Sequence, residues 1–184
     1  MKTPYVILLR GINVGGKNKV TMSDLANSLE ELGFDSVETY IASGNVILDS
    51  DNAPEEIKSK IEIMLLEKFK LEDELIKVLV LSKRQFQSVI QHKPAGFGDE
   101  PDKYHSDAIF LLDMEVSQAM RVFDPREGVD KVWAGEGVIY SQRLSALRTK
   151  SRLNKAISTP EYKSMTIRSW NTIIKLMEIM NQRM

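Results

Sequence analysis

Apolar and polar positions in the first half of the chain alternate in blocks that predict both strands and helices. An unbroken apolar run over residues 5–9, followed by a glycine-rich segment, predicts a buried strand. From Met22 the apolar residues recur at helical spacing, which predicts a helix with Thr21 as its N-cap and Gly33 as its stop. Two β-branched stretches, 37–41 and 45–48, then predict a hairpin.

A second helix and a further strand complete this half. Asn52 as a capping residue, Pro54 and two acidic residues mark a helix start, and apolar residues at helical spacing continue to Phe69. Residues 75–81 return to the pattern of a strand. The order strand, helix, strand, strand, helix, strand is the split βαβ arrangement of ferredoxin-like folds.

The pattern partly repeats after a Pro- and Gly-rich stretch that begins at Lys93. A strand over 108–112, a helix over 116–122 and a hairpin formed by 129–134 and 138–141 are predicted. We therefore predict an α+β protein of two ferredoxin-like (βαββαβ-type) subdomains, arisen by structural duplication. Their predicted bounds are 1–92, which includes a short helix, and 104–184, joined by a linker over 93–103.

The second subdomain is predicted to end in an amphipathic helix. Its apolar positions, from Ile167 through Trp170 to Met180, have helical spacing, and Thr166 is placed to cap it. Such a helix serves as a core element or as a docking surface.

Composition and charge narrow the function classes. The 184 residues include no Cys, which excludes disulfides, thiol nucleophiles and Cys-ligated metals. The N-terminus has too short an apolar run for a signal peptide or a membrane span, so we expect a cytoplasmic protein that is not in a membrane. The net charge of −1 is a cancellation, because residues 1–23 carry +4, residues 24–140 carry −12 and residues 141–184 carry +7. Basic ends favour a phosphate-rich partner if they form one surface.

The glycine-rich segment after the first strand is the strongest candidate site. Gly11, Gly16 and Lys17 have the spacing of a phosphate loop, but Asn18 stands where such a loop needs Ser or Thr for magnesium. A nucleotide hydrolase is therefore disfavoured. Two readings stay open for this segment: an anion site of backbone N–H groups and basic side chains, or a strand-to-helix connection that needs glycine for its conformation.

Acid or base candidates are few. His92 and His105 have no partner at helical ligand spacing, so surface positions are expected for both. Asp107 enters an apolar strand, where a carboxylate needs a partner, and Arg126 or Arg143 could supply it. No metal and no cofactor is assigned.

Three motifs resemble a bacterial family, the domain of unknown function 1697 (DUF1697) family. They are 9–18 with the following 22–34, then 39–46, and last 166–172 with Lys175 and Leu176. The resemblance covers nearly the whole chain and implies a ferredoxin-like fold, in agreement with the predicted order of elements. It implies no particular activity.

The polar motifs are hard to explain by core packing, so we expect them to converge on one anionic ligand. The predicted function is binding of a phosphate-bearing ligand, either a nucleotide or a nucleic-acid backbone. Base-specific RNA binding is disfavoured, because the strand 45–49 lacks stacking aromatics. The alternatives are a small-molecule enzyme that uses Asp107, His105 or another residue, and a homo-oligomeric interaction protein with exposed Met177 and Met180. The predicted ligand-binding residues are Arg10, Asn13, Gly15, Gly16, Lys17, Asn18, Lys19, Ser43, Gly44, Asn45, Arg168 and Asn171.

Overall fold

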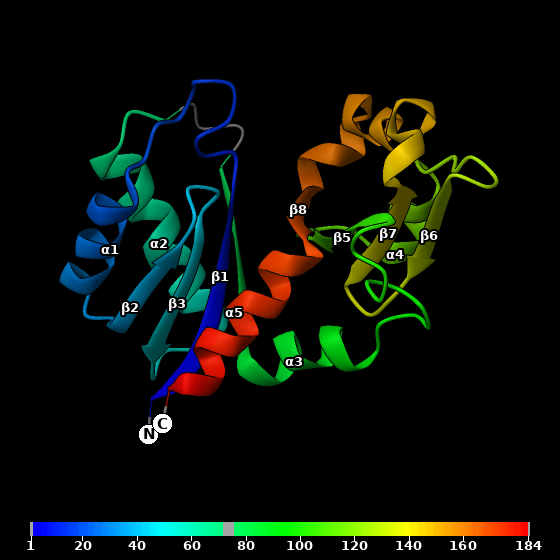
Figure 1. The fold of residues 1–184 in the computed structure, drawn as a ribbon. Coiled ribbons are helices and arrows are strands. Elements are labelled where there is room, and N and C mark those ends of the chain that lie inside the picture. The colour runs from blue at the N-terminus through cyan, green and yellow to red at the C-terminus, as the bar shows by residue number, and fades with distance from the viewer. Residues whose placement is uncertain (1, 72–75, 184) are drawn as a thin grey trace. The chain divides into compact units, whose positions relative to one another are not determined.

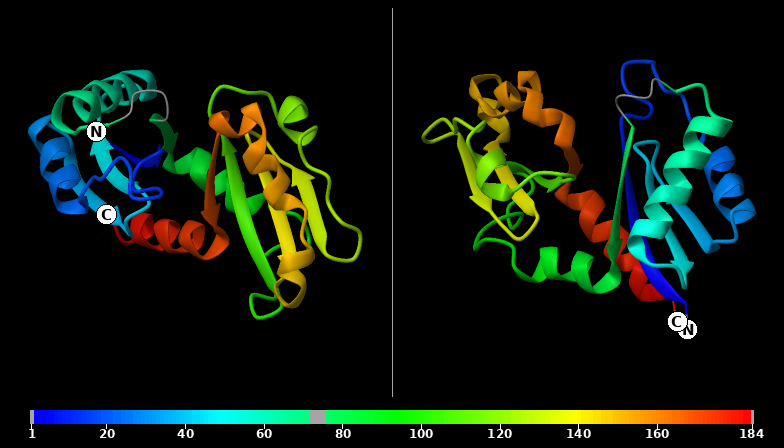
Figure 2. Two further views of the ribbon diagram at one scale, coloured as in Figure 1. Left: turned by 90° about the horizontal axis from the view of Figure 1, so that it is seen from above. Right: turned by 180° about the vertical axis from the view of Figure 1, so that it is seen from behind.

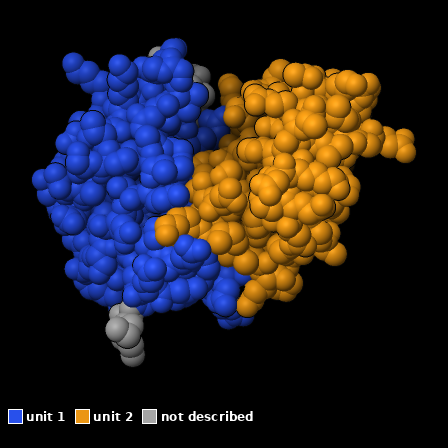
Figure 3. All heavy atoms as spheres, viewed as in Figure 1, with its two compact units in different colours: residues 1–87, 176–184 blue, residues 88–175 orange. Residues whose placement is uncertain are grey.

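The protein is described here by a computed structural model of residues 2–71 and 76–183. The chain forms two compact units (Figure 3). Unit 1 comprises Met1–Gln87 with Leu176–Met184, and unit 2 comprises Ser88–Lys175. Each unit is described by itself below. No helix in the described ranges has both the length and the apolar character needed to cross a membrane.

Unit 1 has the ferredoxin-like fold (Figure 1). Its elements in chain order are β1 (Thr3–Arg10), α1 (Met22–Glu31), β2 (Asp35–Tyr40), β3 (Asn45–Ser50), α2 (Pro54–Lys68), β4 (Lys77–Ser82) and the start of α3 (Lys83–Gln91). The four strands form an antiparallel sheet in the order β2-β3-β1-β4. The predicted strand-helix-strand-strand-helix-strand order is confirmed. Residues 72–75, which include the predicted start of the fourth strand, lie outside the described residues.

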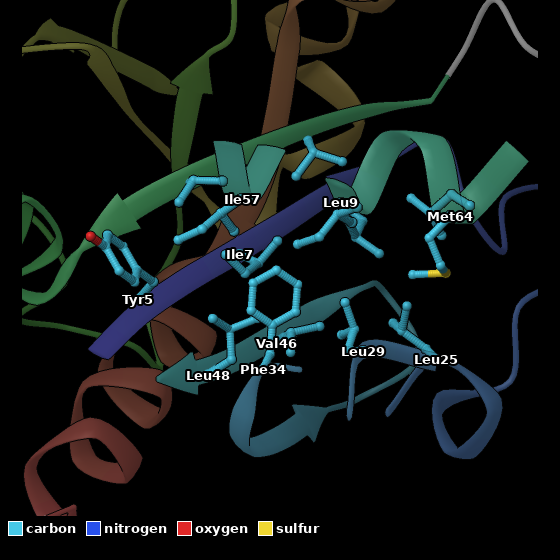
Figure 4. Packing of buried hydrophobic residues seen from close by; sticks show 14 of the residues in the cluster. Tyr5, Ile7, Leu9, Leu25, Leu29, Phe34, Val46, Leu48, Ile57 and Met64 are labelled. Carbon is cyan, nitrogen blue, oxygen red and sulfur yellow. The ribbon is translucent and has the colours of Figure 1, made fainter. Parts of the chain in front are cut away.

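The core of unit 1 lies between the sheet and its two helices (Figure 4). Ile7 and Leu9 of β1 point from the sheet toward α1 and α2, together with Leu48 of β3, and all three are at most 1% exposed. Leu25 of α1 and Ile57 of α2 meet them from the helices. This packing confirms the helical faces expected from the apolar spacing.

The helix starts differ in how they are capped. The Thr21 side chain accepts a hydrogen bond from the Asp24 backbone N–H, which confirms Thr21 as the N-cap of α1. The N-cap of α2 is Ala53, whose side chain cannot cap, so the assignment of Asn52 as the capping residue is wrong. Asn52 instead donates to the Glu56 carboxylate, 2.7 Å away. Pro54 pre-forms the first turn without a side-chain cap.

The opposite face of the unit 1 sheet is also buried. It presents Val6, Leu8 and Ile47, each at most 1% exposed. The chain end contacts the same sheet, since Arg183 donates to the Ile47 carbonyl and pairs with the Glu38 carboxylate at 3.3 Å. On this face neither β1 nor β3 carries an aromatic side chain for stacking on bases.

Unit 2 repeats the strand arrangement. It consists of β5 (Tyr104–Leu111), α4 (Val116–Met120), β6 (Asp130–Ala134), β7 (Val138–Leu144) and β8 (Met165–Ser169), with the antiparallel order β6-β7-β5-β8. This order is equivalent to that of unit 1, as the predicted duplication requires. Three short 3₁₀ segments replace the second crossover helix: η2 (Ser145–Lys150), η3 (Leu153–Ser158) and η4 (Pro160–Ser164). They run along the sheet of unit 2 (gold and orange in Figure 2).

The predicted linker contributes to the core of unit 2. Phe97 is fully buried, and its ring packs in a T-shaped arrangement against the rings of Tyr140 and Trp170, at centroid distances of 5.1 and 5.0 Å. The Tyr140 hydroxyl donates to the Val89 carbonyl at 2.6 Å, and burial raises the pKa of Tyr140 to about 12. Thus residues of 93–103 pack as part of a folded unit.

The C-terminal helix α5 (Trp170–Gln182) begins later than predicted. Thr166 lies in β8, so its assignment as the helix cap is wrong, and the Thr172 N–H bonds to the Ser169 hydroxyl instead. Met177 and Met180, which an oligomeric scaffold would expose, are 9% and 0% exposed. The homo-oligomer alternative thereby loses the apolar surface on which it depended.

Candidate functional site

The glycine-rich segment after β1 folds into a small β-hairpin, which we call the 13–18 hairpin. The Lys17 N–H donates to the Val14 carbonyl at 3.0 Å, and the Asn13 N–H donates to the Asn18 carbonyl at 2.9 Å. Gly15 and Gly16 at its tip have φ values of +58° and +78°, the two positive values that a type I′ turn requires. Helix α1 begins only at Met22. The segment is therefore a hairpin and not a phosphate loop that runs directly into a helix.

Asn13 fixes the base of this hairpin. Its side-chain N–H₂ donates to the carbonyls of Val20 and Ala42, both at 2.8 Å, and its Oδ1 accepts from the Val20 N–H at 2.9 Å. The bond to Ala42 joins two of the three polar motifs, the hairpin and the turn between β2 and β3. These two motifs thus lie together in unit 1, as the convergence hypothesis expected of them.

The other amides of this region also bond to the protein. Asn18 is buried and donates to the Gly11 carbonyl at 2.8 Å. Asn45, with no exposed surface, donates to the Tyr40 carbonyl and to the Ser43 hydroxyl, both at 2.9 Å. Burial and these bonds give the two amides a structural role.

Gly44 is required by close packing. It has a φ of +78°, and a Cβ placed on it would lie 2.7 Å from Leu9 Cβ and 2.8 Å from Ile12 Cδ1. Its carbonyl accepts from the Leu9 N–H at 2.8 Å. Gly44 therefore tightens the turn against β1, whereas Gly15 and Gly16 have no atoms within 4 Å of the corresponding position.

The hairpin carries the exposed basic groups of the site. Lys17 and Lys19 are exposed, and Arg10 is partly buried at the end of β1. Strand pairing adds one cation that sequence reasoning missed, because Arg10 lies opposite Lys77 at the start of β4. The signal was available, since β1 and β4 are antiparallel neighbours in a ferredoxin-like sheet and this pairing brings the end of one beside the start of the other.

The N-terminus of α1 does not add to an anion site. Thr21 already caps it, and Asp24 places a carboxylate in its first turn, 2.6 Å from the Thr21 hydroxyl. A carboxylate there already interacts with the positive end of the helix dipole. The positive groups of the site are therefore those of the hairpin and the adjacent strand ends.

Arg168 and Asn171 belong to unit 2. Arg168 is 6% exposed, and its Nη1 donates to the Thr166 hydroxyl at 2.9 Å and to the Ile167 carbonyl at 2.8 Å. Burial lowers the pKa of Arg168 to about 10. These contacts make Arg168 an internal residue of unit 2, while Asn171 is exposed on α5.

Asp107 has the partners that its place in a strand required. Its Oδ1 lies 3.1 Å from Nε2 of His105, two residues earlier on the same face of β5. Burial raises the pKa of Asp107, and the charges of His105 and Arg143 oppose that rise. Of the two arginines considered, Arg143 is the one whose charge favours the ionised form of Asp107, while Arg126 donates to the Lys150 carbonyl. The His105 contact was missed because helical spacing was tested, whereas strand neighbours on one face are two apart.

The fold gives the class of protein: an α+β chain of two units that share the ferredoxin-like strand order, with a basic hairpin at the end of the unit 1 sheet. The chain is similar to the solved structure of the conserved bacterial protein SP0830 from Streptococcus pneumoniae, with 28% identity and a TM-score of 0.83. The likeness covers 97% of this chain and 99% of the other. Residues 1–140 match the family described as "Protein of unknown function (DUF1697)", and the chain belongs to that family. A comparison with curated proteins gives no match.

Proposed function

We propose that unit 1 binds a phosphate-bearing ligand, a nucleotide or a nucleic-acid backbone, at the 13–18 hairpin. The observation that carries the proposal is the hairpin tip, where two glycines lie between the exposed residues Val14 and Lys17, with the exposed Lys19 nearby. The N–H groups of Gly15 and Gly16 make no hydrogen bond to another described residue. Backbone N–H groups beside lysines are a common way to hold an anion.

The hairpin is held in position before any ligand arrives. Three side-chain bonds of Asn13 and one of Asn18 fix its base to the neighbouring backbone. A loop fixed in this way loses little conformational entropy on binding, so more of the interaction energy contributes to affinity. The predicted ligand residues of unit 1 thus divide into supports and contacts. The supports are Asn13, Asn18, Ser43, Gly44 and Asn45, and the contacts are Gly15, Gly16, Lys17 and Lys19, with Arg10 nearby.

Contact with the phosphates of a nucleic-acid backbone is favoured over recognition of its bases. The sheet face that RNA-recognition modules use for stacking carries the buried aliphatic residues Val6, Leu8 and Ile47 in unit 1. Lysines that neutralise phosphates bind without sequence preference and release counterions. The ligand is therefore recognised by charge.

A titration of labelled single-stranded and duplex oligonucleotides at several salt concentrations tests this function, with a nucleoside triphosphate thermal-shift series beside it. The double variant Lys17→Ala with Lys19→Ala should reduce the duplex slope of log K against log salt by about 1.8. The matched control, Lys70→Ala with Lys131→Ala, removes the same charge from exposed positions away from the hairpin and should keep the slope.

Two results would overturn the proposal. One is the absence of salt-dependent binding to every oligonucleotide together with no thermal shift from any nucleotide. The other is binding that both double variants weaken equally, since this would show an effect of net charge and not of the hairpin.

A further inference from the structure

The proposed hairpin site leaves the basic segment near the other end of the chain without a role. Within that segment, residues 141–160 contain five basic residues and no acidic or aromatic one. Four of the five fall within eight positions, and we call them the 148–155 cluster: Arg148, Lys150, Arg152 and Lys155. Such a density of one charge on a surface favours an anionic partner.

The cluster lies on the short turns that replace the second crossover helix of unit 2 (gold to orange in Figure 1). Arg148 and Lys150 belong to η2, Lys155 belongs to η3, and Arg152 directly precedes η3. All four residues are exposed. Among the residues that the structure describes, the side chains of Arg148 and Lys150 have no hydrogen-bond or ion-pair partner, so their charges are open to a ligand.

The backbone that carries the cluster is tied to the sheet. Asp130 of β6 is 6% exposed, and its Oδ2 accepts from the Arg126 N–H at 3.0 Å and from the Arg152 N–H at 2.8 Å. The Arg126 Nη1 donates to the Lys150 carbonyl at 3.3 Å, and the buried Leu153 anchors η3. Little backbone ordering is therefore needed when a ligand binds.

One exposed carboxylate already pairs with two of these cations. The Asp124 Oδ2 lies 3.2 Å from the Arg152 Nη1 and 3.2 Å from the Lys155 Nζ. The hydrogen bond from Lys155 and the charge of Arg152 hold the pKa of Asp124 below its usual value. All three side chains are at least 44% exposed, so the pairs are weak and a phosphate group can take the place of the carboxylate.

The distribution of the cations favours a polymer over a compact anion. They extend over η2, the connection and η3, so a ligand that meets all four carries several negative groups in a row. Thr149 and Ser151 alternate with the first three cations, and hydroxyl groups beside Arg and Lys are typical of contacts to a nucleic-acid backbone.

The remaining composition of the segment separates a duplex from other polyanions. Binding of single strands relies on bases that stack on aromatic rings, and residues 141–160 contain none. A duplex keeps its bases paired and presents one negative charge per about 1.7 Å of its axis. A helix that lies on a membrane surface places a row of apolar side chains beside its cations, whereas Ile157 is the one large apolar residue of 141–160 that is exposed.

We propose that unit 2 binds the phosphate backbone of a nucleic-acid duplex through Arg148, Lys150, Arg152 and Lys155, without reading its sequence. The cluster neutralises phosphates and releases their counterions. This site lies in unit 2 and does not rest on the proposed function of the hairpin. Each of the two sites can therefore fail without the other.

The test uses the full chain, a labelled duplex of mixed sequence and one of its separate strands, titrated at several salt concentrations. Arg148→Ala with Lys150→Ala should reduce the duplex slope of log K against log salt by about 1.8. Lys70→Ala with Lys131→Ala, exposed positions outside the cluster, should keep the slope. Hydrogen exchange of residues 145–158 should slow when the duplex is added, also in the Lys17→Ala with Lys19→Ala chain.

Asp124→Asn gives the sharper test, because it predicts a gain. Without the carboxylate, Arg152 and Lys155 are both available to phosphates, and duplex affinity at about 0.1 M salt should rise about twofold to fivefold. Glu136→Gln is the matched control, since it removes the same charge from an exposed position of unit 2. The seven residues of β7 separate Glu136 from η2 by about 20 Å, beyond the screening length, so this variant should bind like the parent chain.

Three results would overturn the proposal. One is a slope that Arg148→Ala with Lys150→Ala leaves unchanged while Lys17→Ala with Lys19→Ala lowers it, which would leave the hairpin as the site. Another is an equal effect of Asp124→Asn and Glu136→Gln. The third is binding of the separate strand, of phosphatidylserine vesicles or of polyglutamate as tight as that of the duplex, since the partner would then be of another class. Loss of the slope in the Arg148→Ala with Lys150→Ala chain alone would support this site and count against the hairpin.

Discussion

Replacing Asn13 by glycine should destabilise unit 1 without removing a single charged group of the proposed site. The side chain makes three hydrogen bonds, two to carbonyls at 2.8 Å and one from the Val20 N–H at 2.9 Å. At about 1 kcal/mol net each, their loss lowers the free energy of unfolding by about 3 kcal/mol. Glycine tolerates the φ of +54° at this position, so backbone strain does not add to the loss.

Urea unfolding followed by far-ultraviolet circular dichroism measures this change. A loss of about 3 kcal/mol corresponds to a fall of the midpoint by about 1 to 3 M. Hydrogen exchange should show the loss of protection first at Val20, whose N–H donates to the Asn13 side chain. Lys19→Ala, an exposed change nearby, should stay within about 0.5 kcal/mol.

Asn13→Ala adds a second measurement. Alanine loses the same bonds and must also adopt a left-handed backbone, so it should be less stable than Asn13→Gly by about 1 kcal/mol. The reasoning is refuted if Asn13→Gly unfolds within about 0.5 kcal/mol of the parent chain. Weakened oligonucleotide binding by a fully stable Asn13→Gly would instead show that Asn13 contacts the ligand directly.

Three further predictions follow from other contacts. Gly44→Ala should cost about 2 to 5 kcal/mol in urea unfolding, since a Cβ meets Leu9 and Ile12 and the φ is positive, while Gly15→Ala should cost only about 1 to 2 kcal/mol. Arg168→Ala should destabilise unit 2 by about 2 to 4 kcal/mol, because it leaves a cavity and unpaired hydrogen-bond acceptors. Trp133 and Trp170 both lie in unit 2, so tryptophan fluorescence follows its unfolding, and an unchanged unfolding midpoint would contradict an internal role for Arg168. The pKa of Asp107 is raised in the folded state, so ionising this carboxyl costs the folded chain more free energy than the unfolded chain. The resulting destabilisation is absent at low pH and grows as pH rises past the ordinary carboxyl range. Asp107→Asn should therefore be the more stable chain at pH 7 and lose that advantage toward pH 4, and a constant difference between pH 4 and 7 would count against this.

The prediction of elements succeeded where one face of an element is buried. The helix from Met22 to Gly33 and the hairpin around Gly44 were found because apolar periodicity and turn residues are local properties of the chain. β8 was missed for a specific reason. Ile167 fits the helical spacing of the residues that follow it, so the strand Met165–Ser169 was read as part of the helix. Only pairing with β5 makes this segment a strand.

For the candidate site, too, local pattern predicted the position and the fold decided the roles of the side chains. Sequence pattern located the glycine-rich segment and its lysines, but it could not separate side chains that hold the loop from those that face outward. Asn13, Asn18 and Asn45 have the residue type of ligand contacts, and the folded chain uses their amides to bond its own backbone. Satisfaction of buried polar groups depends on which carbonyls come within reach, and that is set by the fold.

By itself, then, the sequence determined the two ferredoxin-like repeats, the family and the basic segment after the first strand, because periodicity, turn residues and motifs are all read along the chain. The tertiary structure decided which distant groups meet. Register placed Lys77 opposite Arg10, and the pairing of β5 with β7 placed Ser141 opposite Asp107. The fold of the 3₁₀ segments that replace a crossover helix placed Arg152 and Lys155 beside Asp124. Such contacts arise between residues far apart in the chain, so no local pattern records them.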